Sequence, residues 1–188
     1  MSIILLLACQ QSDFHAFQCE DGPILTSVEV GYRYDGAFYD RFGESGVVAL
    51  RYAAQTWSDA SCGNLIIEEG LSPVLFEIGL HSGTISEQYS MDGIGGDLAI
   101  AFDLQHSQFP GKMFLDAAEP WAIGAQCDVD EVELQTIVTH EIGHLLGLCH
   151  LKERIALMHS DYKGPHYTLE EQDKIYFRNL YGWGDCDD

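Results

Sequence analysis

The fold of this protein is decided by residues 140–150, which read HEIGHLLGLCH. On a helix, His140 and His144 lie one turn apart, roughly 6 Å along the axis and on one face, so both imidazoles can reach one metal ion. His150 would lie roughly 240° further round a continuous helix, so it can join them only if the helix ends first. Gly147 stands where that end is needed, because glycine readily adopts the left-handed conformation. The spacing therefore predicts a helix that stops at Gly147 and a three-histidine metal site.

Three neutral imidazoles leave the fourth position of a tetrahedral zinc ion open for water, which is the arrangement of a catalytic site. Glu141 follows the first ligand and is placed to take the proton of that water. The alternative is a helix with three incidental histidines, and the residue frequencies of this chain give such a match a chance of roughly one in 10⁴. We therefore interpret His140, His144 and His150 as zinc ligands and Glu141 as the general base.

The composition is that of one folded domain with an acidic surface. Of the 188 residues, 46% are hydrophobic and 21% are charged. With 30 acidic and nine basic residues the net charge is −21, which repels phosphate backbones and anionic lipids, so we expect no nucleic-acid partner. No apolar run approaches the roughly 18 to 20 residues that a membrane-spanning helix needs. The surplus of carboxylates suits hard cations, although most of these acids are expected to form a solvated surface.

Residues 1–23 are expected to be a signal or lipobox segment with an N-terminal tail, preceding a domain over residues 24–188. Leu6-Leu7-Ala8-Cys9 resembles a bacterial lipobox, in which the Cys is lipidated after cleavage. The apolar run is short and no Lys or Arg precedes it, so a secretory remnant and a plain buried segment remain open. We expect an exported, extracellular or cell-envelope protein, with membrane attachment only through a lipidated Cys9.

Six cysteines in a chain with such a start favour an oxidising compartment, and none of them has the CxxC spacing of a zinc site. Lipidation of Cys9 would leave an odd number. Cys127 and Cys149 flank the histidine segment and are the preferred disulfide pair, while buried free thiols that pack as small hydrophobes are the alternative.

The hydrophobic pattern predicts a mixed α+β domain. Capping boxes are expected at Asp130 with Glu133 and at Thr168 with Glu171. Strands are predicted over residues 24–34, 64–67, 73–78 and 98–102, and helices over residues 45–60, 130–147 and 168–182.

At residues 140–150 the chain resembles the metzincin zinc peptidases, whose signature HExxHxxGxxH it matches at every fixed position. Met158 lies where that family has the methionine of a tight turn beneath the zinc. Ser160 replaces the Tyr found two residues after that Met in other branches, and Tyr162 follows, as in the matrixin branch. The resemblance implies a zincin-like α+β domain with a twisted, mostly parallel sheet, an active-site helix and a C-terminal helix. His159-Ser160 departs from the Tyr-Pro of the family and leaves the wall of the specificity pocket open.

The resemblance also implies a monomeric endopeptidase that acts on proteins or peptides. An extended substrate would pair antiparallel with Leu98, Ala99 and Ile100, and Thr136 and Tyr162 would lie at the substrate pocket. Two rival functions are a calcium-stabilised interaction module whose zinc site does not turn over, and a zinc hydrolase acting on something other than proteins. The intact Glu141 disfavours the first, and the third His with the Met turn disfavours the second.

A structural calcium site is the second implication of the resemblance. Asp92, Asp116 and Glu119 would supply carboxylates, and Gly93, Gly95 and Asp97 would supply carbonyl oxygens, about six oxygens in all. The alternative is a glycine hairpin with surface acids.

The second, structural zinc of matrixins is not expected. Ile100 and Phe114 stand at two of its His positions, which leaves His81, with His106 as a possible substitute.

Overall fold

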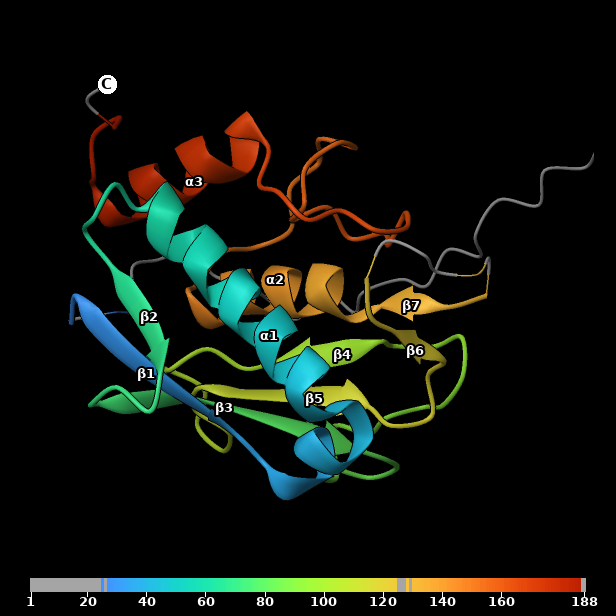
Figure 1. Cartoon of the computed structure of the whole chain (residues 1–188). Helices are drawn as coiled ribbons and strands as arrows, with labels where there is room; N and C mark the ends of the chain where they lie inside the picture. The colour runs from blue at the N-terminus through green and yellow to red at the C-terminus, as the bar shows by residue number, and fades with distance from the viewer. Residues whose placement is uncertain (1–24, 26, 125–127, 129, 187–188) are drawn as a thin grey trace, which may run out of the picture.

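Five strands form the main sheet of the computed structural model, which describes residues 25, 27–124, 128 and 130–186. The strand order is β2-β1-β3-β5-β4, and every neighbouring pair is parallel except β4 with β5. The predicted twisted, mostly parallel sheet is therefore confirmed, and β4 forms one of its edges (Figure 1). The strands are β1 (Glu29–Tyr34), β2 (Ile66–Glu69), β3 (Val74–His81), β4 (Ala99–Ala101) and β5 (Lys112–Asp116).

Three helices complete the α+β fold: α1 (Gly36–Ala60), α2 (Leu134–Leu145) and α3 (Glu171–Tyr181). The helix α1 packs on α2 and on the sheet, and α2 lies beside the edge strand β4 (Figure 1). Trp57 of α1 is buried, and its indole N–H donates a hydrogen bond of 2.8 Å to the Thr139 carbonyl of α2. No helix among the described residues combines the length and the apolar character that crossing a membrane requires.

The predicted start of α2 at Asp130 was wrong. Val132–Glu133 forms β7, which pairs with β6 (Trp121–Ala122), so these two residues are extended rather than helical. The side chain of Glu133 then caps the helix by accepting the N–H groups of Gln135 at 3.1 Å and Thr136 at 2.7 Å. Glu133 is therefore the N-cap rather than the third helical residue.

The other two helix starts also differ from the prediction. The helix α3 has its capping box at Glu170 and Asp173, not at Thr168. The helix α1 begins at Gly36, where Asp35 caps it, and Gly43, with φ of +56°, interrupts it. The predicted helix from residue 45 is thus only the part that follows this interruption.

A disulfide joins Cys62, just after α1, to Cys186, after α3, across 124 residues of sequence. The sequence analysis did not propose this pair. Cys149 is also disulfide-bonded. Cys127, which was its predicted partner, lies outside the described residues, as do Cys9 and the rest of residues 1–23.

Candidate metal centre

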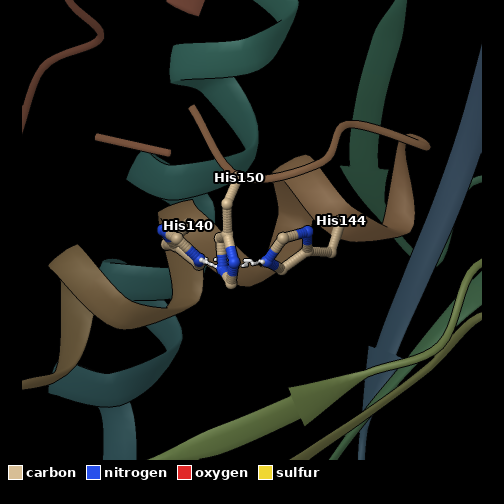
Figure 2. Close-up of side chains that lie close together, drawn as sticks. All are labelled: His140, His144 and His150. Carbon is tan, nitrogen blue, oxygen red and sulfur yellow. Dashed lines mark hydrogen bonds between the residues drawn. The ribbon is translucent and has the colours of Figure 1, made fainter. Parts of the chain in front are cut away.

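The three predicted histidine ligands converge on one point (Figure 2). The Nε2 atom of His140 lies 3.0 Å from that of His144 and 3.2 Å from that of His150, and the remaining pair is 3.1 Å apart. Zn–N bonds of about 2.0–2.1 Å in tetrahedral geometry place ligand nitrogens roughly 3.3 Å from each other. The spacing of the three nitrogens therefore fits a zinc ion.

Hydrogen bonds on the far side of the rings fix which nitrogen faces the centre. The Nδ1 atoms of His140 and His144 lie 2.7 Å from the carbonyl oxygens of Leu157 and Leu148. A carbonyl only accepts hydrogen bonds, so both Nδ1 atoms carry the proton and both Nε2 atoms present a lone pair. Lone pairs directed at one another at this distance repel unless a cation lies between them, and this arrangement is the one in which histidine binds metals.

The chain leaves the helix where the sequence predicts. Leu146 is the C-cap of α2, and Gly147 has a φ of +86° in the left-handed region. The Leu148 N–H returns to the Gly143 carbonyl at 3.0 Å, which turns the chain toward His150. The third candidate ligand, His150, thus comes from the loop after α2, because the helix ends before it.

The environment keeps the imidazoles neutral, which is the form that binds metal. Burial, followed by the neighbouring rings, lowers the pKa of His140 well below its ordinary value. Burial and the proximity of His150 lower the pKa of His144 to about 4. The pKa of His150 is also lowered, chiefly by burial.

Glu141 lies in the same turn of α2 and is buried. Burial, with a smaller contribution from Asp97, raises the pKa of its carboxyl to about 8, while the backbone N–H of Ala101 acts in the opposite direction. Its buried Oε1 atom has no hydrogen-bond partner among the described residues. Buried acceptors are normally satisfied, so this oxygen is suited to a partner that arrives with the metal, such as a bound water.

Met158 is fully buried and packs against α2 at Gly143, between His140 and His144 in the sequence. Gly143 makes this contact possible, because a Cβ at that position would overlap the Met158 sulfur and come within 2.8 Å of the Trp57 ring. The Met turn predicted by the resemblance therefore packs on the helix that carries the first two ligands.

Asp173 of α3 holds this turn in place and is completely buried. Its carboxylate accepts the N–H groups of Leu157 at 2.8 Å and Met158 at 3.0 Å, and that of Glu170 at 2.9 Å. Since the Leu157 carbonyl in turn accepts the His140 imidazole N–H, α3 is connected to the metal ligand through two hydrogen bonds. The spacing of the sequence motifs did not indicate this role of Asp173.

The matrixin family profile matches residues 32–182 of this chain. The chain belongs to the matrixin family. This membership confirms the branch that Met158 and Ser160 indicated. Matrixins use a catalytic zinc, and His140, His144 and His150 can hold it.

Similar curated proteins include matrix metalloproteinase-17 of Homo sapiens, which is 32% identical over 146 residues, covering 74% of this chain and 24% of that protein. Karilysin of Tannerella forsythia is 32% identical over 137 residues, 72% of this chain and 28% of that protein. Metalloendoproteinase 2-MMP of Arabidopsis thaliana is 35% identical over 108 residues, 55% of this chain and 28% of that protein. This matrixin chain thus spans about a quarter of the length of these relatives.

The edge strand β4 of this matrixin presents main-chain groups toward α2. The Phe102 N–H and the Leu98 carbonyl bond to β5 and its continuation, so the alternation of an antiparallel pair directs the polar groups of Ala99 and Ala101 away from β5. The side chains of Leu98, Ala99 and Ile100 are buried. Of these three predicted substrate residues, only Ala99 can therefore offer main-chain groups to a peptide, because those of Leu98 and Ile100 face β5.

A small cavity adjoins the metal site of the matrixin domain on the side of His140. Its volume is about 40 Å³, and Thr136 and Tyr162, both predicted at the substrate pocket, line it. The Thr136 hydroxyl is already used: it donates to Glu133 at 2.8 Å and accepts the His166 N–H at 2.8 Å. The rest of the lining is Ile137, His140, Arg154, Ala156, Leu157, His159, Asp161, Lys163, Gly164 and His166.

The residues predicted to bind calcium lie in two neighbouring segments of the chain. Asp116 and Glu119 are buried, and they accept the N–H groups of Gly93 at 2.9 Å and Gly95 at 2.7 Å. Asp92 accepts the N–H of Asp97 at 2.8 Å. The carboxylates do not converge as the histidines do, since within the described ranges only the three histidines form a group whose metal-binding atoms all lie within 4.8 Å.

His81 and His106 occupy aromatic surroundings. The His81 ring packs edge-on against Phe114, and the His106 ring stacks on Phe109 at 5.9 Å between centroids. The described residues thus contain no three-residue His, Cys or carboxylate group at this position, and a second zinc is not proposed.

Proposed function

We propose that this matrixin domain is a zinc-dependent endopeptidase in which Glu141 is the general base. The observation that supports the proposal most directly is the buried, unpartnered Glu141 oxygen beside three converging imidazole nitrogens. When bound, zinc supplies a Lewis acid that polarises the scissile carbonyl and acidifies a water molecule. Glu141 accepts the proton of that water and passes it to the departing amine.

The edge strand β4 orients the substrate. The main-chain groups of Ala99 and the carbonyl of Ala101 face away from β5, while the Ala101 N–H is engaged by the Glu141 carboxyl. An extended peptide that pairs antiparallel with these free groups lies between β4 and α2, which carries His140 and Glu141. The side chain next to the cleaved bond then reaches the cavity beside His140 and Thr136. This geometry favours a polypeptide substrate over a small hydrolysable ester or amide.

The decisive experiment compares wild type with Glu141→Gln on an unstructured protein substrate. The variant keeps the size of the side chain but cannot accept a proton, so it should retain one zinc per chain and lose roughly 10²- to 10⁴-fold in turnover. Metal content is measured separately from cleavage. Glu87→Gln, at an exposed loop position, is the matched control and should cleave like wild type.

Equal cleavage by wild type and Glu141→Gln would contradict the assigned base. Zinc binding without any cleavage by wild type would instead support the interaction module, which nothing in the geometry of the centre favours. A chelator should abolish cleavage, and added zinc should restore it.

We also propose that the loop containing Asp92, Gly93, Gly95 and Asp97 binds a structural calcium ion together with Asp116 and Glu119. The burial of two carboxylates whose described hydrogen bonds come from main-chain N–H groups supports this site. Burial raises the pKa of Glu119, and the charges of Asp116 and Asp92 add to the effect. A divalent cation would offset this repulsion and desolvation.

We also propose that the protein is exported and that Cys9 is lipidated. A separate observation supports export. The Cys62–Cys186 disulfide belongs in an oxidising compartment, where such bonds persist. Incorporation of a labelled fatty acid into wild type but not into Cys9→Ser would test the lipid anchor.

A further inference from the structure

The cavity beside His140 gathers positive charge in a strongly acidic protein. Arg154 and Lys163 line it, and they are two of only nine Lys and Arg residues in a chain whose net charge is −21. Lys163 Nζ donates a hydrogen bond of 2.7 Å to the Arg154 carbonyl, which holds the two residues together at the same wall. Both residues are exposed to solvent, so the wall that they form carries a local charge opposite to that of the molecule as a whole.

The two cations form no ion pair with any described carboxylate. Within the described part of the chain, no carboxylate oxygen lies within 4.0 Å of the Arg154 guanidinium or the Lys163 ammonium group. Burial, followed by the charge of Arg154, lowers the pKa of Lys163. Burial, followed by Lys163 and Arg154 among other charges, also lowers the pKa of His159. The charge of Arg154 contributes to both shifts, and the charge of Asp161 opposes both.

Acidic groups at the cavity only partly offset this potential. The Asp161 carboxylate accepts the Ser160 hydroxyl at 3.2 Å and lies 3.8 Å from His159 Nδ1. His166 faces Glu170, with 3.2 Å between Nε2 and Oε1. Among the lining residues, Arg154 and Lys163 carry two positive charges against the one negative charge of Asp161. The Glu133 carboxylate behind Thr136 is already held by the N–H groups of Gln135 and Thr136, so a negatively charged ligand group would pair with the remaining positive charge.

The size of the cavity restricts that group. A volume of about 40 Å³ holds a few heavy atoms rather than an aromatic ring. The Thr136 hydroxyl does not compete for the ligand, because Glu133 and the His166 N–H already engage it. A planar carboxylate, which pairs well with guanidinium and ammonium donors, matches both the size and the charge.

We infer that this cavity is a specificity site for an acidic side chain, so that the enzyme prefers Asp or Glu immediately C-terminal to the cleaved bond. The inference rests on the proposed peptidase function. Arg154 and Lys163 are the specificity-determining residues, and they act on the substrate side chain rather than on the reacting atoms.

The test uses peptides that differ only at that one residue, with Glu, Gln or Leu. Wild type should cleave the Glu peptide with a kcat/KM roughly 5- to 20-fold above that of the Gln peptide at low salt, because a charge-assisted contact replaces a neutral one. The ratio should fall as salt is added. In Arg154→Gln/Lys163→Gln the ratio should drop to about one while cleavage of the Leu peptide persists.

Arg51→Gln is the matched control, because it removes one positive charge on α1, where Arg51 pairs with Glu69 outside the cavity. This variant should retain the wild-type Glu-to-Gln ratio. A charge-reversed variant, Lys163→Glu, should favour Lys over Glu at the same peptide position.

Two outcomes separate this inference from the proposed function. If wild type cleaves the Gln and Leu peptides as well as the Glu peptide, the cavity does not select acidic side chains although the enzyme is a peptidase. If no peptide is cleaved, the affinities of two peptide hydroxamates that differ only in Glu or Gln at this residue are compared. Binding of these compounds needs the metal site but no turnover. Equal affinity of that pair overturns the inference, and tighter binding of the Glu compound supports it.

Discussion

Asp173 shows how a single side chain far from the metal in sequence sets the position of a ligand. One buried carboxylate accepts three main-chain N–H groups, two of them from the turn that carries Met158. That turn presents the Leu157 carbonyl to His140 and packs the Met158 side chain beneath α2. Asp173 is therefore a positioning residue for the first zinc ligand.

We expect Asp173→Asn to weaken zinc binding roughly 10- to 100-fold, because an amide offers one acceptor where the carboxylate offers two, and its NH₂ group faces N–H donors. The free energy of unfolding should fall by about 1–3 kcal/mol as buried N–H groups lose their partner. Zinc release to a competing chelator and urea unfolding measure the two effects. Glu171→Gln, on the exposed side of the same helix, is the control, and equal zinc affinity in both variants would rule out the positioning role.

The sequence predicted the zinc ligands but not Asp173, and the difference is physical. His140 and His144 are related by one helical turn, so their spacing alone places them together. Asp173 acts on an irregular turn 15 and 16 residues away in sequence, where no periodicity relates the partners.

At the scale of secondary-structure elements, the hydrophobic pattern of the sequence predicted most of the segments that form helices and strands. It did not predict the ends that strand pairing gives to these segments. The strand β5 (Lys112–Asp116) was not predicted, although it lies between β3 and β4 and carries Asp116. Its five residues follow a turn and are too few to show alternation clearly. The late start of α2 likewise depends on the pairing of β7 with β6.

The loop between β3 and β4, which contains Asp92 and Asp97, gives a prediction at this scale. Calcium should raise the melting temperature of wild type by binding only the folded state, and Asp116→Asn should remove most of this gain. Glu87→Gln, in the same connection but outside the proposed ligands, should retain it. A melting temperature indifferent to calcium in wild type would refute the site.

The calcium effect should also depend on pH. The pKa of Glu119 is raised above its ordinary value of 4.5, so without calcium the folded state binds the proton more tightly than the unfolded chain does. Its contribution to stability is then present below pH 4.5 and is lost as the pH rises through the folded-state value. Calcium needs the ionised carboxylate, so the gain in melting temperature should shrink on acidification. Titration of that gain between neutral pH and pH 4.5 measures this, and a gain independent of pH would exclude Glu119 as a ligand.

At the scale of the whole molecule, the Cys62–Cys186 disulfide ties the end of α1 to the segment after α3. The helix α1 carries Trp57 against α2 and against Phe177 of α3, so the bond secures the packing of all three helices. The two cysteines are 124 residues apart in the sequence, and closing a longer loop removes more conformational entropy from the unfolded chain.

The double variant Cys62→Ser/Cys186→Ser should therefore lose about 2–5 kcal/mol of unfolding free energy. The disulfide of Cys149 stays intact in this variant, so the loss belongs to one bond, whereas a reducing agent would break both. Urea unfolding under oxidising conditions makes the measurement. Zinc content should be unchanged at low urea, and a stability equal to that of wild type would show that helix packing alone holds the C-terminus.

The sequence alone predicted the three candidate ligands, the proposed general base, the helix break at Gly147 and the matrixin branch, because these depend on residues within about twenty positions whose spacing is set by helix geometry and chain reversal. It also determined the α+β class and most strands through hydrophobic periodicity. Only the tertiary structure decided the placement of β5, the role of Asp173, the pairing of Cys62 with Cys186 and the gathering of Arg154 and Lys163 beside His140. Each of these is a contact formed when separate segments pack, and packing is the step that local pattern does not encode.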